Sequence, residues 1–254
     1  MEYGKSKGQF YTPGEVSRIM AKVIGIDKAT DPSMTVYDPA CGSDSLLIRA
    51  ADEAPREISI YGQDKDDSTA GLARMNLVLH NKGTGVVVGN KSTLPAPQYK
   101  EEDNPELLKP FNYIVVNPPF SDKSWMDGIT IPDVYSRYSE TVLGVPPEKN
   151  GDYAWLLHVL KSLKSNGKAA IIIPHGVLLR GNAEADIRKK NINRGYIKGI
   201  IGLPANLFYG MGIPACILVL EKEDTAERTG IFMRRQQRLC KGRQQEPLAG
   251  TGYS

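Results

Sequence analysis

The 254-residue chain has little of what marks membrane, secreted or metal-dependent proteins. It contains no run of 18 apolar residues that could form a transmembrane helix, and its first ten residues, MEYGKSKGQF, lack the apolar segment of a signal peptide. Its three cysteines, Cys41, Cys216 and Cys240, are odd in number and far apart, which argues against a disulfide framework. We therefore expect a cytoplasmic protein with reduced thiols and no membrane partner.

Histidine and excess charge are also scarce. His80, His158 and His175 show no metal-ligand spacing, so the sequence predicts no metal site. The net charge is +3, but residues 231–254 hold five cations and one acid, so the other 230 residues sum to −1. The bulk charge therefore gives no evidence of a nucleic-acid surface.

Strand and helix patterns alternate along the chain. β-Branched and apolar runs predict seven strands, at residues 35–37, 58–61, 86–88, 111–116, 169–173, 197–201 and 215–220. Helical patterns predict an opening helix at 12–24, with Thr12 as N-cap and Pro13 at its first position, and further helices at 45–51, through Leu72, Met75 and Leu79, and at 153–163. Strands separated by helices require crossovers, which favours a doubly wound, mostly parallel sheet.

The segment FNYIVVNPPF, residues 111–120, runs as an apolar strand and stops on Asn117-Pro118-Pro119-Phe120. Tandem prolines end a strand abruptly, at the sheet edge where open α/β folds bind ligands. An aromatic amine is a poor nucleophile. Acceptance of its two N–H groups by the Asn117 side-chain oxygen and the Pro118 carbonyl would free its lone pair, while Phe120 stacks on a flipped base. A plain turn with an exposed Phe120 is the alternative.

Two other predicted strand ends carry candidate binding residues. In VYDPACGSDSLL, an acid, Asp38, and a small-residue turn through Gly42 allow backbone N–H groups to approach a nucleotide-like ligand closely. In IYGQDKDDS, Asp64 follows the next strand, where a carboxylate can accept hydrogen bonds from both ribose hydroxyls. The alternatives are a helix-capping turn in the first segment and mere capping of the next helix by Asp66 and Asp67 in the second.

Taken in order, the segments GQFYTP, DPACGS, YGQD, NPPF, IIIPHGVLLRG and IIGLPANLFYGMGIPACILVL resemble the modification subunit of type I restriction-modification systems, a family of N6-adenine DNA methyltransferases. The resemblance covers roughly residues 8–222. It implies the class I S-adenosylmethionine-dependent methyltransferase fold, a doubly wound, seven-stranded, mostly parallel sheet with an antiparallel last strand. The catalytic domain would occupy residues 1–230, followed by a tail at 231–254.

The resemblance further implies S-adenosylmethionine as methyl donor and assigns its contacts. The residues implied at the methionine end of the cofactor are Gln9, Phe10, Tyr11, Thr12 and Pro13. Those implied in the turn beneath it are Asp38, Pro39, Ala40, Cys41, Gly42 and Ser43. Asp64 would hold the ribose and Asn90 would lie near the adenine of the cofactor. The implied catalytic residues are Asn117, Pro118, Pro119 and Phe120.

By this resemblance the protein is a site-specific DNA adenine-N6 methyltransferase. Its implied partners are double-stranded DNA, a specificity subunit that selects the site, a restriction subunit and a second modification subunit. The sulfonium of the cofactor already activates the methyl group, so the reaction needs proximity more than acid–base help. Two alternatives stay open. One is a truncated, catalytically impaired remnant of that subunit, and the other is a protein-glutamine N5 methyltransferase, whose amide substrate has the same poor nucleophilicity.

One position departs from the family pattern. Where the family has a second glycine in the turn, this chain has Asp44 after Gly42 and Ser43. In one interpretation the Asp44 side chain caps the following helix. In the other it faces the cofactor's own carboxylate, at a cost on the order of 4 kcal/mol for charges about 4 Å apart at an effective dielectric constant of about 20. The second interpretation predicts impaired cofactor binding.

The ends of the chain also depart from the family. The resemblance leads us to expect a long helical region before GQFYTP and a C-terminal region, and their absence favours the remnant. Residues 231–254 are basic and lack helical or strand periodicity. One permissible set of codons for residues 234–254, read in another frame, gives IDASKGFAKDGNKNRLREQDI, which resembles the continuation expected in the family. We hypothesise a disordered, out-of-frame tail; a basic extension that binds phosphates is the alternative.

Overall fold

The structure is a computed structural model that describes residues 11–204, 207–208, 212–222 and 232–235, the last range without its side chains. The predicted cofactor residues Gln9 and Phe10, and the tail beyond residue 235, lie outside the described residues. Within the described part of the chain, no helix is long and apolar enough to cross a membrane.

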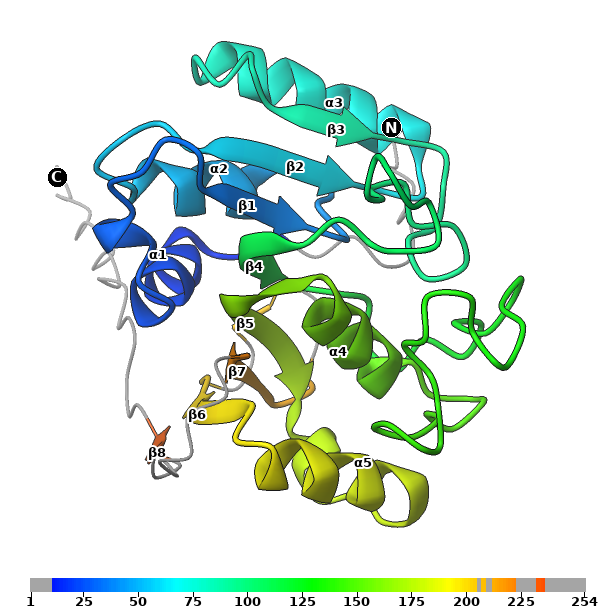
Figure 1. The fold of residues 1–254 in the computed structure, drawn as a ribbon. Coiled ribbons are helices and arrows are strands. Elements are labelled where there is room, and N and C mark those ends of the chain that lie inside the picture. Colours follow the sequence, from blue (N-terminus) through cyan, green and yellow to red (C-terminus); the bar gives the residue numbers. More distant parts are fainter. Residues whose placement is uncertain (1–10, 205–206, 209–211, 223–231, 236–254) are drawn as a thin grey trace, which may run out of the picture.

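One mixed sheet forms the centre of the fold and runs in Figure 1 from β3 at the top to β8 at the bottom. Its strands are β1 (Thr35–Asp38), β2 (Ser59–Gln63), β3 (Val86–Val88), β4 (Phe111–Val116), β5 (Leu163–Pro174), β6 (Ile197–Gly202), β7 (Ala215–Glu221) and β8 (Phe232–Arg235). Their order is β3-β2-β1-β4-β5-β7-β6-β8, and β7 alone is antiparallel to its neighbours. All seven predicted strands are therefore confirmed, as is the mostly parallel sheet with an antiparallel β7.

The sequence predicted neither the position of β7 in the sheet nor the strand β8. β7 is inserted between β5 and β6, and β8 pairs in parallel with the far side of β6. β8 lies in the segment for which the sequence predicts no regular structure. Four residues are too few to show a periodicity, and the strand exists because β6 offers it a free edge. The out-of-frame tail stays a prediction.

Helices cover both faces of the sheet. They are α1 (Gly14–Val23), α2 (Ser45–Asp52), α3 (Asp67–Leu79), α4 (Asp152–Lys161) and α5 (Asn182–Asn193), with the 3-10 turns η1 (Ile26–Lys28) and η2 (His175–Leu178). Residues of α1, α2 and α3 form one apolar cluster with Val36 and Val115, and residues of α4 and α5 form a second with Tyr37 and Ile114. Because neighbours along β1 and β4 face opposite clusters, the sheet is doubly wound, as predicted.

Helix α3 exposes the apolar residues whose spacing predicts it. Leu72, Met75 and Leu79 are 56%, 61% and 74% exposed, while Ala70 and Ala73 are buried. The packed face is narrow because the helix lies close to the chain after β3: a Cβ added to the glycine at 89 would lie 2.8 Å from Ala70 Cβ. The helix is confirmed. Its orientation was decided by the small side chains that allow close packing on its inner face, and the spacing of the larger apolar residues does not show this.

Helix α5 has no counterpart among the predicted helices. Its buried residues are Glu184, Ile187 and Asn191, so only one of the three is apolar. A helix whose inward face is mostly polar gives no amphipathic pattern to recognise.

The chain changes direction across the sheet at β1. β2 and β3 lie on one side of β1, and β4 and β5 lie on the other. The carboxyl ends of β1 and β4 therefore flank a topological switch point, where open α/β sheets bind their ligands. Since these strands are parallel, Asp38, Asp64 and Asn117 all lie at this one edge of the sheet.

Candidate functional site

The turn between β1 and α2 is held by its own backbone and by β2. The Ala40 N–H donates to Asp38 Oδ1 at 2.9 Å, and the Cys41 N–H donates to the Gln63 carbonyl at 3.0 Å. Gly42 has φ of 56°, which glycine adopts without steric cost. A Cβ built on Gly42 would meet no atom within 4 Å, so this side of the turn has room for a ligand.

Asp64 binds this turn from the end of β2. Its Oδ2 accepts the Gly42 N–H at 3.1 Å and its Oδ1 accepts the Asp66 N–H at 2.9 Å. Each carboxylate oxygen can accept more than one hydrogen bond, so both keep capacity for ribose hydroxyls. The residues fit the predicted ribose contact, and Asp66 does cap α3, through its side chain and the Thr69 N–H at 2.7 Å.

Asn90 lies just beyond the end of β3, the strand that neighbours β2. The Asp64 N–H donates to the Val88 carbonyl at 3.0 Å, which joins the ends of β2 and β3. Asn90 itself is exposed and has a left-handed backbone, with φ of 59°. Asparagine is among the residues that tolerate this conformation.

The opening helix begins one residue later than predicted. Pro13 is the N-cap of α1, and no side chain caps this helix. Thr12 is 3% exposed, and its hydroxyl accepts a hydrogen bond from Asn117 Nδ2 at 3.1 Å. The prediction that Thr12 caps α1 is therefore wrong, because its hydroxyl faces a residue 105 positions away. The neighbouring Tyr11 is 60% exposed, and its hydroxyl accepts a hydrogen bond from Arg49 on α2 at 3.2 Å.

Asn117 presents a buried acceptor without a partner. Its amide nitrogen donates to Thr12, while its Oδ1 is out of contact with solvent and has no hydrogen-bond partner. No hydrogen bond to the Pro118 carbonyl is found among the described residues either. An unpaired buried acceptor costs roughly 1–3 kcal/mol, so this oxygen would gain from an arriving N–H donor.

Phe120 packs against protein at the end of the tetrapeptide. It is half-buried, and its ring meets that of Phe208 edge to face, with the centroids 6.3 Å apart and the planes at 80°. The alternative of a turn with an exposed Phe120 is therefore wrong. Phe208 comes from the segment between β6 and β7, so this one residue of the segment lies beside the tetrapeptide.

A buried carboxylate that the sequence patterns did not single out anchors the chain after Phe120. Asp152, 2% exposed at the start of α4, accepts the Ser121 N–H at 2.7 Å and binds Arg180 at 2.7 Å. Ser121 has φ of 52°, so the chain turns sharply here. An acid in the first turn of a helix was the only available signal, and it is also the common signal of simple capping.

A buried glutamine plays a similar part beside the turn. Gln63 is fully buried; its Nε2 donates to the Lys91 and Ala96 carbonyls at 3.0 and 3.1 Å, and its Oε1 accepts the Gln98 N–H at 3.0 Å. These three bonds hold the segment after Asn90 against β2. Gln63 belongs to the YGQD segment, and its role in this segment was not predicted.

Asp44 contradicts both interpretations of its side chain. It occupies the N-cap position of α2, but it makes no capping hydrogen bond and its φ is 70°. The residue is fully buried, and Oδ1 lies 3.2 Å from a Cβ built on Gly62 in β2, so the carboxylate points into the protein rather than out over the turn. The expected need for a glycine backbone is confirmed by the left-handed φ.

Burial governs the protonation of this acid. Both Asp44 oxygens lack a hydrogen-bond partner, because the nearby Cys41 thiol is a weak donor and lies 3.7 Å from the Gly42 carbonyl instead. Burial raises the pKa of Asp44 to about 7, and the Cys41 thiol offsets part of that rise. Burial also raises the pKa of Asp38 well above its usual range, although the Ala40 N–H opposes this.

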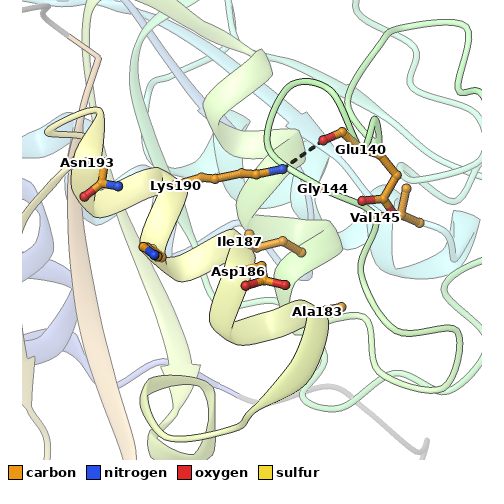
Figure 2. A pocket seen from close by; sticks show the side chains of 9 residues that line it. Glu140, Gly144, Val145, Ala183, Asp186, Ile187, Lys190 and Asn193 are labelled. Carbon is orange, nitrogen blue, oxygen red and sulfur yellow. Dashed lines mark hydrogen bonds between the residues drawn. The ribbon is translucent and has the colours of Figure 1, made fainter.

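A hollow of about 460 Å³ lies elsewhere, between α5 and the loop at residues 139–145 (Figure 2). Lys190 crosses its upper side and donates to the Glu140 carbonyl at 2.8 Å. None of the predicted site residues lines it. Two lysines and two acids line it, so their charges balance.

Comparison with known proteins gives a consistent family. The sequence profile described as N-6 DNA Methylase matches residues 1–250. The methylase subunit of the type I restriction enzyme MpnII from Mycoplasma pneumoniae is 35% identical over 229 residues, which cover 86% of this chain and 41% of that protein. The corresponding MjaIX subunit from Methanocaldococcus jannaschii is 31% identical over 87% of this chain and 38% of that protein.

A solved structure agrees with these relatives. The crystal structure of a type I restriction-modification methyltransferase subunit from Streptococcus thermophilus has a TM-score of 0.75 and 34% identity over 89% of this chain and 47% of that one. The chain thus spans less than half the length of these relatives.

Proposed function

The chain belongs to the N-6 DNA methylase family, and from this premise we propose that it is the catalytic region of a DNA adenine-N6 methyltransferase of the type I modification kind. The observation that carries the proposal is the unpaired Asn117 oxygen, which lies at the switch point of the sheet. An acceptor held there without a partner suits the N–H of an exocyclic amine.

The residues at the switch point fit S-adenosylmethionine. Gly42 leaves open space above the turn, and both Asp64 oxygens keep acceptor capacity for a ribose. In this proposal Asp64 holds the ribose, Asn90 lies near the adenine of the cofactor and residues 38–43 lie beneath it. Once bound, the cofactor supplies a methyl group that its sulfonium already activates.

The protein's own part in the reaction is positioning. The Asn117 oxygen and the Pro118 carbonyl would each accept one N–H of the target amine, drawing its nitrogen toward tetrahedral geometry and freeing its lone pair. Phe120 would stack on the base. Because the Asn117 oxygen is closed off from solvent, the layer above it must open before a base can enter. Phe208 meets edge to face the ring of Phe120, the residue proposed to stack on the base.

We further propose that the substrate is double-stranded DNA, and that a specificity subunit selects the sequence. The names of the relatives support this, as they are methylase subunits of type I restriction enzymes. The proposed complex also contains a restriction subunit and a second modification subunit.

The test is methyl transfer by the whole chain to unmethylated DNA, with and without a type I specificity subunit. We expect labelled methyl to appear as N6-methyladenine and Asn117→Ala to reduce transfer by roughly a hundredfold or more, since it removes one of the two acceptors. Label found in protein glutamine would favour the alternative substrate. Wild-type protein that binds the cofactor and transfers methyl to neither substrate would overturn the proposal.

A further inference from the structure

We propose that Thr12 is a positioning residue for Asn117: its hydroxyl holds the side-chain amide so that the Asn117 oxygen faces the substrate amine. This inference rests on the proposed function, because it concerns the acceptor that the methylated amine would use. It also gives Thr12 a role distinct from the cofactor contact that the family resemblance implies.

The amide of Asn117 has two ends of similar size and opposite hydrogen-bonding character. Its nitrogen lies 3.1 Å from Thr12 Oγ1, and its oxygen has no partner. If the amide turned over, two N–H donors would face the N–H groups of the substrate amine, and neither could accept a hydrogen bond. The orientation of this one amide therefore decides whether the site can activate an amine.

Thr12 is well suited to hold that orientation. It is 3% exposed and β-branched, so its side chain has little rotamer freedom. The Pro13 that follows has a fixed φ, and its carbonyl accepts hydrogen bonds from the Ser17 N–H at 3.1 Å and the Ser17 hydroxyl at 3.3 Å. The backbone on one side of Thr12 is thus tied to the first turn of α1.

The chain contains a matched pair at the other end of the same strand. Thr35 Oγ1 lies 3.1 Å from Asn112 Oδ1, and the Thr35 N–H donates to the same oxygen at 3.1 Å. Asn112 precedes Asn117 by five residues in β4, so this second pair lies at the opposite edge of the sheet, about 16 Å away. Thr35→Val therefore removes a hydroxyl from a Thr–Asn pair outside the candidate site.

The experiment compares Thr12→Val, Thr12→Ser and Thr35→Val in the whole chain. For Thr12→Val we expect kcat for methyl transfer to fall roughly 10- to 100-fold, while the dissociation constant of S-adenosylmethionine changes less than about threefold. Thr12→Ser keeps the hydroxyl and should restore most of the rate, and Thr35→Val should leave it near wild type. In an Asn117→Ala background, Thr12→Val should cost nothing further.

Two kinetic outcomes would overturn the inference. A Thr12→Val protein that loses cofactor affinity and keeps kcat would make Thr12 a cofactor ligand. Equal, additive losses in the wild-type and Asn117→Ala backgrounds would show that Thr12 does not act through Asn117.

A second measurement separates this inference from the proposed function. In nuclear magnetic resonance spectra, the side-chain amide protons of Asn117 should shift and exchange faster in Thr12→Val, but not in Thr12→Ser. In Thr35→Val only the Asn112 amide should change. If the wild type transfers no methyl group, the proposed function fails and these amide signals still decide the role of Thr12. Unchanged Asn117 signals in Thr12→Val would refute it.

Discussion

At Asp44, a carboxylate lies where the backbone conformation suits glycine. Its φ of 70° is strained for a residue with a Cβ, and both of its oxygens are buried without a partner. The sequence marks this position as unusual, since the resemblance to the family implies a glycine there. The direction of the side chain was wrong, because it depends on a gap between the turn and β2 that the sequence does not show.

Replacing Asp44 with glycine should stabilise the protein, and more so at higher pH. The folded-state pKa of about 7 lies above the ordinary value of 3.8, so folding costs free energy once the pH exceeds 3.8, and this cost grows up to about pH 7. We expect Asp44→Gly to raise the free energy of unfolding by about 1 kcal/mol at pH 4, from strain alone, and by roughly 3 kcal/mol at pH 8. Urea titrations of both proteins at each pH measure this.

Asp44→Asn is the matched control, because it removes the charge and keeps the Cβ. Its stability relative to wild type should also rise with pH, but it should stay below that of Asp44→Gly. A gain from glycine that is the same at pH 4 and pH 8 would contradict the buried-carboxylate account.

At the scale of elements, α3 and α5 show where periodicity is a sufficient guide and where it is not. The spacing of Leu72, Met75 and Leu79 predicts α3, yet these residues face solvent. Helix α5 was missed because its buried residues are mostly polar. Both elements are oriented by the surface they pack against, and the helical period contains no information about that surface.

Two leucines on opposite faces of α3 should therefore differ in how much they contribute to stability, although they are equally hydrophobic. Leu77 is 2% exposed. Leu77→Ala should lower the free energy of unfolding by roughly 2–4 kcal/mol, because the smaller side chain leaves a cavity. Leu79→Ala, on the exposed face of the same helix, should change stability by less than about 0.5 kcal/mol. Chemical denaturation compares the two, and equal losses would mean that α3 is oriented differently.

At the scale of the whole molecule, a buried charge network joins the loop between β4 and α4 to helix α4. Arg137 pairs with Asp133 at 2.7 Å, and it lies 3.2 Å from His158 Nδ1 on α4. Burial lowers the pKa of His158 well below 6.5, and the neighbouring Arg137 lowers it further. His158 is therefore neutral in the folded protein and accepts from Arg137.

Acid should destabilise the protein through this histidine. Below pH 6.5 the unfolded chain binds a proton at His158 that the folded chain does not, so stability is present above that pH and is lost as the pH falls. Asp44 and Asp38 have the opposite effect, because burial raises the pKa of each carboxyl, and Asp44→Asn removes the part that comes from Asp44. We expect Asp44→Asn to lose more stability between pH 6.5 and pH 5 than the double variant with His158→Gln. Parallel profiles would exclude His158 as the cause.

The sequence alone determined seven of the strands and four of the α-helices in the described part of the chain, and the edge of the sheet where the site lies. Strands are local patterns, and the chemistry of Asp38, Asp64 and Asn117 follows from each residue's place just after a strand. Parallel pairing then brings strand ends together whatever the side chains between them are.

Only the tertiary structure decided which side chains meet. Thr12 and Asn117 are 105 residues apart. Asp152, at the start of α4, contacts Ser121 and Arg180, which lie in two other segments of the chain. Such contacts depend on how closely elements approach and on which buried polar atoms remain to be paired. Those are properties of the packed whole, and no local pattern along the chain contains them.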